Sequence, residues 1–329
     1  GPGLTNALTA MAQAKADSVP MLVISGVNRR ATLGKGLGHL HELPDQLGTL
    51  KSLVKWAARI ERPADAPAVI AEAFRQMLTG RPGPVVIALP EDMLTSLTEA
   101  APLAGPARVA EPAPDGAALS EALAMVSGAK RPLILIGGCN WSKAGQVALQ
   151  TFAETSDIPV IAAFRYQDQF DNFSPVYAGE AGVGMPPHVR GLIQDADVIL
   201  AVNVRFGEMT TDGYTLLKVP VPVQRLIHVH TSDREIGKIY QPTIGIQAGP
   251  NAFSAALTPV KGGWGAWRDK ARADWEAGFE LPPQPSPVDM GLATAHLREV
   301  LPADVILTNG AGNFTVWPNK FYKFGPQAR

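Results

Sequence analysis

The chain has 329 residues, of which 46% are hydrophobic and 18% charged, with a net charge of −1; at about 100–200 residues per domain this predicts two or three domains. The balanced charge, without a run of Lys or Arg, excludes a nucleic-acid-binding class, and the single cysteine, Cys139, excludes a disulfide framework or a Cys-based zinc site. No apolar run reaches the roughly 18 residues of a membrane span and no signal peptide is visible, so the sequence predicts a cytoplasmic protein with no membrane partner.

Short apolar runs alternate with helical patterns along the chain. The runs cover residues 20–26, 83–90, 131–138, 158–164, 197–203, 225–230 and 304–310. Each run is apolar on both faces, which is typical of parallel strands covered by helices on both sides. Helical periodicity separates them, for example over 65–80 and 145–157. The pattern predicts an α/β fold of three-layer αβα type with parallel, doubly wound sheets.

Two breaks in this pattern predict the domain organisation. Residues 101–115 are rich in Pro and Ala without a period, which indicates a linker. Residues 261–287 combine a Trp-bearing helix with a Pro-rich run, and form a second linker. We therefore expect a central Rossmann-like domain over 116–260, flanked by incomplete α/β domains over 1–100 and 288–329.

The two flanking domains are expected to be incomplete for a physical reason. Gly1-Pro2-Gly3 is predicted to form a turn that feeds a helix, and a strand normally precedes such a turn. Residues 288–329 offer one helix and one strand, and a single strand cannot bury itself. Both flanking domains are therefore expected to continue outside the chain.

Three stretches carry candidate site residues. In Gly1–Asn6, glycines permit an unusual backbone turn, and Thr5 or Asn6 would otherwise cap the helix. The loop "HLHELPDQ" at 39–46 holds His41, which can act as an acid or base near neutral pH, and Glu42, which accepts hydrogen bonds when ionised. The alternative for this loop is a solvated polar surface.

The third stretch is Gly310-Ala311-Gly312-Asn313-Phe314, placed directly after a predicted strand. Such a loop can present backbone N–H groups to a phosphate, and the alternative is an ordinary strand-to-helix turn. Gly137-Gly138 forms a similar strand–glycine–helix sequence in the central domain. His228 and His230 share a strand face, but no third ligand is evident, so no metal site is predicted.

Several of these stretches, in the same order, resemble the thiamine-diphosphate-dependent enzymes and most closely the acetolactate synthase group. Residues 1–26, 40–63 and 80–94 resemble the second half of the pyrimidine-binding (PYR) domain. Residues 129–164, 195–206 and 227–238 resemble the central domain, and 301–317 resemble the first strand and turn of the diphosphate-binding (PP) domain. The resemblance implies that 1–100 is the C-terminal part of a PYR domain and 288–329 the start of a PP domain.

The resemblance also implies an activity, cofactors and partners. It implies an enzyme of lyase or transferase type, with thiamine diphosphate and Mg²⁺, that decarboxylates a 2-oxo acid and makes or breaks a C–C bond. It implies a homodimer or homotetramer, because PYR and PP domains of different subunits meet in this family. The glutamate that activates the cofactor would lie before Gly1 and the Mg²⁺-binding motif after Arg329, so the chain alone is expected to be inactive.

The family's functional positions map onto specific residues here. Gly3, Thr5 and Asn6 would face the cofactor's aminopyrimidine, and Ala311, Gly312, Asn313 and Phe314 its diphosphate. His41 and Glu42 would face the substrate, where acetolactate synthases carry Phe and Gln, while Phe314 replaces an imidazole. An ionised Glu42 disfavours a pyruvate-like anion, so these departures put pyruvate specificity in doubt.

FAD, which acetolactate synthases bind in the central domain, is not expected. Arg205 matches the FAD-binding pattern, but Val183 and Gly184 stand where a Met and a His would fall. Two alternative functions stay open: a nucleotide-binding Rossmann-like module that takes FAD or ADP, and a non-catalytic relative of the enzymes.

Overall fold

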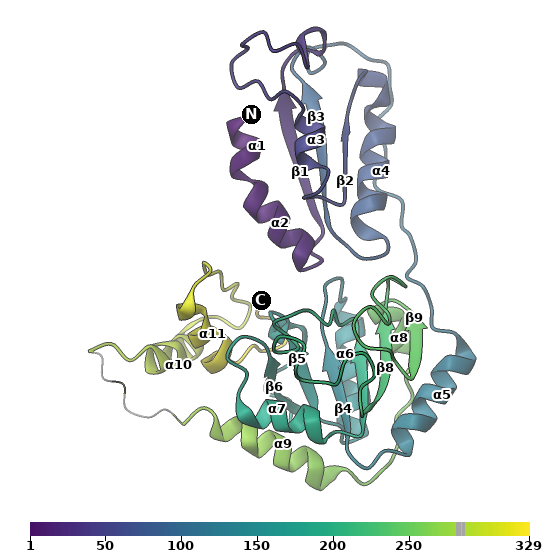
Figure 1. The fold of residues 1–329 in the computed structure, drawn as a ribbon, viewed down its shortest axis with the longest axis vertical. Coiled ribbons are helices and arrows are strands. Elements are labelled where there is room, and N and C mark those ends of the chain that lie inside the picture. Colours follow the sequence, from purple (N-terminus) through teal and green to yellow (C-terminus); the bar gives the residue numbers. More distant parts are fainter. Residues whose placement is uncertain (281–283, 285–286) are drawn as a thin grey trace. The chain divides into compact units, whose positions relative to one another are not determined.

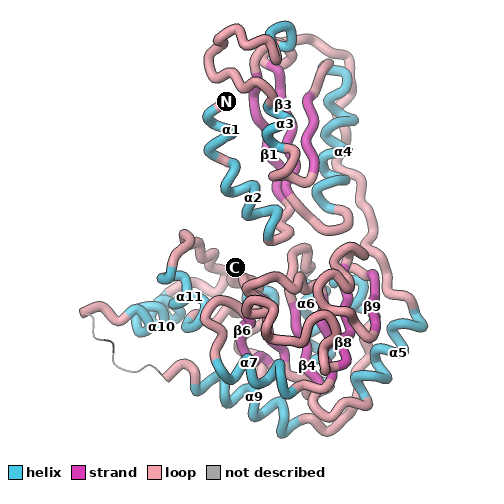
Figure 2. The backbone as a smooth tube through the Cα atoms, in the orientation of Figure 1, coloured by secondary structure: helices cyan, strands magenta, loops and turns pink. Residues whose placement is uncertain are grey.

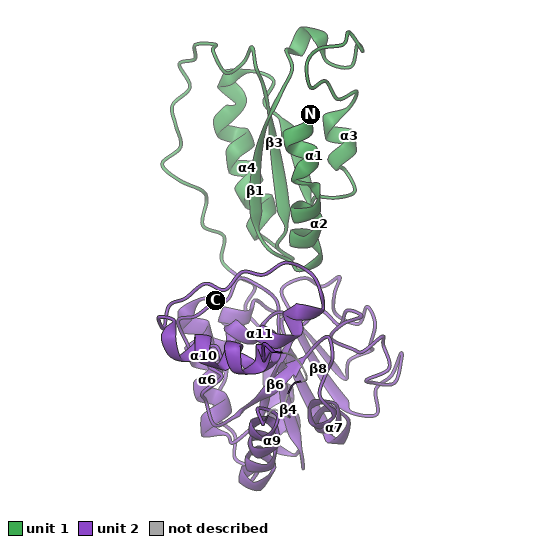
Figure 3. Cartoon of the chain, turned by 90° about the vertical axis from the view of Figure 1, so that its left-hand side faces the viewer, with its two compact units in different colours: residues 1–110 green, residues 111–329 purple. Residues whose placement is uncertain are grey.

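The computed structural model describes residues 1–280, 284 and 287–329, which form two compact units, Gly1–Ala110 and Glu111–Arg329 (Figure 3). Residues 101–115, the predicted linker, carry no helix or strand. The Pro-rich run of the second predicted linker, at 281–287, lies almost wholly outside the described residues. The domain bounds predicted around that run stay predictions.

Unit 1 is a small parallel sheet between helices (Figure 1). Its elements are α1 (Pro2–Asn6), α2 (Leu8–Ala16), β1 (Met21–Val27), η1 (Arg30–Thr32), α3 (Gln46–Leu50), β2 (Trp56–Arg59), η2 (Pro63–Asp65), α4 (Ala66–Leu78) and β3 (Pro84–Pro90). The strand order is β1-β3-β2, with Met21 opposite Pro84 at the start of the β1–β3 pair.

The residues of β3 show why both faces of this sheet need a cover. Val86 packs with Leu4, Met11 and Leu50, which come from α1, α2 and α3. Its neighbours Val85 and Ile87 point to the other face and pack with α4. Successive strand residues face opposite sides, so an all-apolar strand is stable only between two helix layers.

Unit 2 contains a larger parallel sheet. Its elements are α5 (Gly116–Ser127), β4 (Pro132–Ile136), α6 (Lys143–Thr155), β5 (Val160–Ala163), η3 (Gln167–Gln169), β6 (Tyr177–Ala181), α7 (Pro187–Asp195), β7 (Val198–Val202), β8 (Arg225–His230), β9 (Ile244–Gln247), α8 (Pro250–Ala256), α9 (Gly265–Ala277), α10 (Met290–Val300), η4 (Asn313–Thr315) and α11 (Val316–Phe321). The strand order is β6-β5-β4-β7-β8-β9. Starting from β4, the chain adds strands first on one side of the sheet and then, from β7 on, on the other side, which defines a doubly wound sheet.

The same alternation organises the core of unit 2. On β4, Ile134 and Ile136 pack toward α5, α6 and α8, whereas Leu133 and Leu135 pack toward α7 and α9. Trp264 and Trp267 join this core, and their indole N–H groups donate to the carbonyls of Ala129 and Pro132, at 3.0 and 2.9 Å. The predicted three-layer αβα class with parallel sheets is confirmed.

Most of the predicted strands form, and the exceptions have physical causes. Six of the seven predicted runs coincide with β1, β3, β4, β5, β7 and β8. The pattern missed β2, β6 and β9, which are short or interrupted by glycine, such as "YAGEA" and "IGIQ". The predicted strand at 304–310 is wrong. Across this segment, the Leu307 N–H donates to Arg329 O and the Arg329 N–H donates to Val305 O, but no strand among the described residues pairs with it, and an extended segment without a strand neighbour forms no sheet (Figure 2).

The C-terminal segment, residues 301–329, is held on the body of unit 2 although it contains no strand. The backbone N–H of Asn172 donates to Phe324 O, and the backbone N–H of Phe324 donates to the side-chain oxygen of Asn172, both at 2.9 Å. Lys143 Nζ donates to Pro326 O at 2.8 Å. Within the described residues, no helix combines the length and the apolarity that crossing a bilayer needs.

The α6 layer generates a stability prediction. Phe152 lies on α6 and is fully buried in the core of unit 2, so Phe152→Ala leaves a cavity and should lower the free energy of unfolding by about 3–5 kcal/mol. Urea denaturation measures this loss. Val147→Ala, at a 50% exposed position of the same helix, is the matched control and should change the free energy by less than about 0.5 kcal/mol. Equal losses in the two variants would contradict the packing described.

Candidate functional site

The first candidate stretch is already helical where a turn was predicted. Helix α1 begins at Pro2, with Gly1 as its N-cap, and the backbone N–H of Leu4 donates to Gly1 O at 3.0 Å. Thr5 and Asn6 lie inside α1, so the alternative in which one of them caps the helix is wrong, while their predicted contact with the cofactor stays a prediction. The Thr5 hydroxyl donates to Pro2 O at 3.0 Å. Gly3, Thr5 and Asn6 are all exposed, so a ligand can reach them.

The structure brings this helix start against the loop that carries His41. A Cβ atom on Gly1 would lie 2.8 Å from His41 Cβ and would also collide with the His41 carbonyl oxygen. The His41 backbone takes a left-handed conformation, with φ of 61°, and its side chain is exposed. Asn28, directly after β1, donates to Leu40 O at 3.1 Å, which holds the loop at the carboxyl end of β1. Parallel sheets bind ligands at this end of their strands.

Glu42 and Gln46 leave acceptor atoms unused in the same loop. Glu42 Oε2 accepts from the backbone N–H groups of Gly38 and His39, at 2.8 and 3.1 Å. Its Oε1 atom and Gln46 Oε1 are buried without a hydrogen-bond partner among the described residues. Buried acceptors normally have a donor, so both atoms suit a ligand that presents N–H or O–H groups.

The residues of the glycine-rich turn at 310–314 are all exposed in unit 2. The ring of Phe314, which is 51% exposed, folds over Gly312, where a Cβ atom would lie 2.7 Å from Phe314 Cε1. The turn runs into η4 and α11, so the helix that follows it, rather than a preceding strand, positions it. Ala311, Gly312 and Asn313 belong to this turn in unit 2, whereas His41 and Glu42 belong to unit 1.

The space beside the glycine pair Gly137-Gly138 in unit 2 is occupied by Asn203. Gly138 has φ of 67°, and a Cβ atom there would lie 2.8 Å from Asn203 Cγ. Asn203 Nδ2 donates to Cys139 O at 3.0 Å, which closes the turn from the end of β7. Arg205, just after β7, forms an ion pair with Glu235 at 3.3 Å.

The two histidines of β8 bond to the backbone. His228 Nε2 lies 3.0 Å from Val204 O, and His230 Nδ1 accepts from the backbone N–H of Ser232 at 2.9 Å. Burial lowers the pKa of His228. The described part of the chain contains no group of three or more His, Cys, Asp or Glu that could hold a metal ion.

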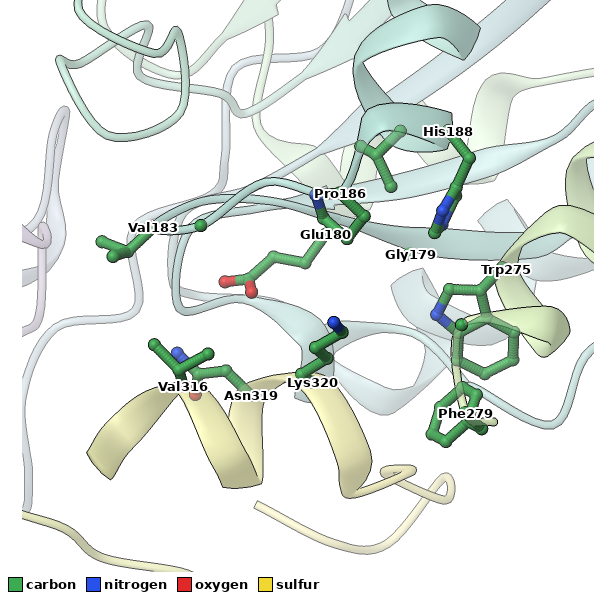
Figure 4. A pocket seen from close by; sticks show the side chains of 13 residues that line it. Gly179, Glu180, Val183, Pro186, His188, Trp275, Phe279, Val316, Asn319 and Lys320 are labelled. Carbon is green, nitrogen blue, oxygen red and sulfur yellow. The ribbon is translucent and has the colours of Figure 1, made fainter. Parts of the chain in front are cut away.

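A further pocket, which the sequence did not reveal, surrounds Glu180 on β6. Figure 4 shows the Glu180 carboxylate pointing toward α11, with Asn319 and Lys320 opposite and Trp275 and Phe279 beside them. Glu180 Oε1 accepts from the backbone N–H of Arg165 at 2.8 Å, and Oε2 accepts from Gln167 Nε2 at 2.9 Å. The one feature of the sequence that could have indicated this pocket is the charged residue inside "YAGEA". This run does not follow the pattern of a strand, so the position of Glu180 on a strand was not predicted.

The environment of Glu180 shifts its proton equilibrium. Burial raises the pKa of Glu180 to about 7, and the Arg165 N–H and guanidinium oppose that rise. His188 lines the same pocket, and burial lowers the pKa of this side chain. Glu180 is therefore partly protonated at neutral pH, whereas a carboxylate in water is ionised.

Comparisons with known proteins give the chain a context. Residues 119–257 match the family model "Thiamine pyrophosphate enzyme, central domain", and residues 1–49 match "Thiamine pyrophosphate enzyme, N-terminal TPP binding domain". The chain is 27% identical over 340 residues to the acetolactate synthase large subunit of Parasynechococcus marenigrum. It is 30% identical over 351 residues to a probable chloroplastic acetolactate synthase 2 of Oryza sativa subsp. japonica. It is 28% identical over 333 residues to the acetolactate synthase isozyme 1 large subunit of Escherichia coli.

The alignments cover nearly all of this chain but only part of each relative. They span 99%, 98% and 98% of the chain, against 54%, 50% and 57% of the three relatives in the same order. The chain thus spans about half the length of the curated relatives it matches.

The shifted pKa of Glu180 predicts how stability changes with pH. The folded pKa of about 7 lies above the ordinary value of 4.5, so ionisation costs the folded state more than the unfolded state. The stability of the natural chain relative to Glu180→Gln should therefore be greatest below pH 4.5 and fall by about 3 kcal/mol as the pH rises through 7.

Urea unfolding of both proteins at several pH values measures this difference. Any constant effect of the substitution cancels, because only the change of the difference with pH is compared. A difference that stays flat across this range would contradict the raised pKa of Glu180.

Proposed function

Because the chain belongs to the thiamine pyrophosphate enzyme family, we propose that it is part of a thiamine-diphosphate-dependent, acetolactate synthase-like enzyme that decarboxylates a 2-oxo acid and makes or breaks a C–C bond. The observation that carries the proposal is the packing of Gly1 against His41, which unites the helix start and the polar loop at the carboxyl end of β1. When bound, the cofactor supplies the group that stabilises a carbanion.

The residues of unit 1 fit the pyrimidine side of this cofactor. An aminopyrimidine presents N–H donors, and the buried Oε1 atoms of Glu42 and Gln46 are acceptors that no described donor satisfies. The exposed groups of Gly3, Thr5 and Asn6 would line the approach. These contacts would orient the cofactor ring against the sheet.

The residues of unit 2 fit the diphosphate side. The exposed turn from Gly310 to Phe314 would offer backbone N–H groups of Ala311, Gly312 and Asn313 to the phosphate oxygens. We include Mg²⁺ in the proposal as the counter-ion of the diphosphate, and assign it no ligand among the described residues of this chain. FAD stays outside the proposal, because Asn203 fills the glycine turn of the central domain.

On the substrate side, His41 would exchange a proton with the reacting molecule. Its side chain is exposed at the loop surface, so it can reach a bound 2-oxo acid. An imidazole can both donate and accept a proton, which is what general acid–base chemistry needs. Glu42 is held by two backbone N–H groups and contributes negative charge. This charge disfavours a small anion such as pyruvate and favours a 2-oxo acid with a hydrogen-bond donor beyond its carboxylate.

The assembly and location complete the proposal. We propose a homodimer or homotetramer, in which a PYR-type unit of one subunit meets a PP-type segment of another, and a cytoplasmic location. The test is decarboxylation of pyruvate and other 2-oxo acids by the protein that carries this chain, with and without thiamine diphosphate. Turnover that needs no thiamine diphosphate would refute the proposal.

His41 yields a prediction about activity. His41→Ala should lower kcat by about 100-fold, because a positioned acid or base contributes roughly that factor or more. The free energy of unfolding should stay unchanged, since the side chain is exposed. Steady-state kinetics and urea unfolding measure the two quantities.

His39→Ala is the matched control, because His39 lies in the same loop and its backbone bond to Glu42 survives the substitution. It should keep kcat within about threefold of the natural protein. Equal kcat values for the two variants would remove His41 from the reaction.

A further inference from the structure

Gln167 joins the body of the central domain to the C-terminal segment. It belongs to η3 and is only 6% exposed. Its Nε2 atom donates to Glu180 Oε2 at 2.9 Å and to the backbone carbonyl of Asn319 at 2.7 Å. A side-chain amide nitrogen carries two hydrogens, so these two bonds use its full donor capacity.

The carboxylate of Glu180 is what orients this amide. Both of its oxygens receive donors: Arg165 N–H at Oε1 and Gln167 Nε2 at Oε2. A neutral amide at position 180 would place an NH₂ group against one of these donors, whereas a carboxylate accepts at both atoms. The two donors therefore favour a carboxylate at position 180, although burial disfavours the ionised form of Glu180 and raises its pKa.

The acceptor on α11 is a carbonyl that the helix itself does not satisfy. Helix α11 has six residues, and the last four carbonyls of a helix have no intrahelical partner. The backbone N–H of Tyr322 donates to the carbonyl oxygen of Pro318 at 3.0 Å, and the side-chain amide of Gln167 donates to the carbonyl oxygen of Asn319. Figure 4 shows Asn319 on the side of α11 that faces Glu180.

We propose that Gln167, oriented by Glu180, is a positioning residue that holds α11, and with it the turn at 310–314, on the central domain. The anchoring of α11 stands on the hydrogen bonds alone. Its consequence for the cofactor rests on the proposed function, because the turn at 310–314 is the candidate contact for the diphosphate. The pocket beside Glu180 has a volume of only about 40 Å³, which suits a few water molecules rather than a substrate.

Hydrogen–deuterium exchange of the chain without cofactor tests the anchoring. Gln167→Met keeps the side-chain volume and removes both bonds, so amide exchange over 316–322 should accelerate about tenfold, while exchange over 132–136 of β4 stays unchanged. Gln150→Met is the matched control, because it removes a 2.8 Å amide–carboxylate bond to Glu154 on α6, away from α11. Unchanged exchange over 316–322 in Gln167→Met would overturn the proposal.

A charge swap separates positioning from general stabilisation. In Gln167→Glu combined with Glu180→Gln, the new amide at 180 can donate to the new carboxylate, so the Tm lost in Glu180→Gln alone should largely return. The carboxylate at 167 cannot donate to Asn319 O, so exchange over 316–322 should stay fast. A swap that restores slow exchange as well as Tm would show that the bond to Asn319 does not hold α11.

Calorimetric titration of the protein that carries this chain with thiamine diphosphate, in the presence of Mg²⁺, tests the consequence for the cofactor. Gln167→Met should bind at least fivefold more weakly than Gln150→Met, since the turn is less well positioned. If Gln167→Met exchanges faster but binds equally well, the link from α11 to the turn is wrong. If the natural protein that carries this chain binds no thiamine diphosphate, the cofactor assignment fails, and the exchange data alone decide the anchoring.

Discussion

A parallel strand has to cover both of its faces, and this constraint organises the whole chain. On β4, Leu133 and Ile134 face opposite helix layers, and Val85 and Val86 do the same on β3. Because helices cover the faces of these sheets, the loops at the strand ends remain as places where polar groups can meet a ligand. The loop after β1, with His41 and Glu42, occupies such a place.

The constraint also explains how much of the fold the sequence predicts. Strands that are apolar on both faces, such as 131–138 and 197–203, stand out in the pattern, and the layers follow from them. Strands such as β6 and β9 are interrupted by Gly179 and Gly245, so only their place in a sheet identifies them. The run at 304–310 shows the converse, because its residues suit a strand but no strand in the described part of the chain pairs with them.

The candidate site was predictable in part for a similar reason. Motif order along the chain places Gly3, His41 and Gly312 in recognisable stretches, and family resemblance assigns them roles. The contact between Gly1 and His41 joins residues that are far apart in sequence, so it emerges only from packing. Glu180 and Gln167 were not predicted as functional, because neither lies in a motif. Their role depends on the two amide hydrogens of Gln167, which bond to Glu180 and to the carbonyl of Asn319 in the C-terminal segment.

The absent side chain of Gly1 has a mechanical consequence. The space that a Cβ atom would take is filled by the carbonyl group and Cβ of His41, so the first turn of α1 and the loop at 39–46 are in steric contact. A shift of either segment toward the other therefore requires the other to move as well. The conformational freedom of the loop is therefore coupled to that of the beginning of α1. A molecule that immobilises one segment also reduces the motion of the other.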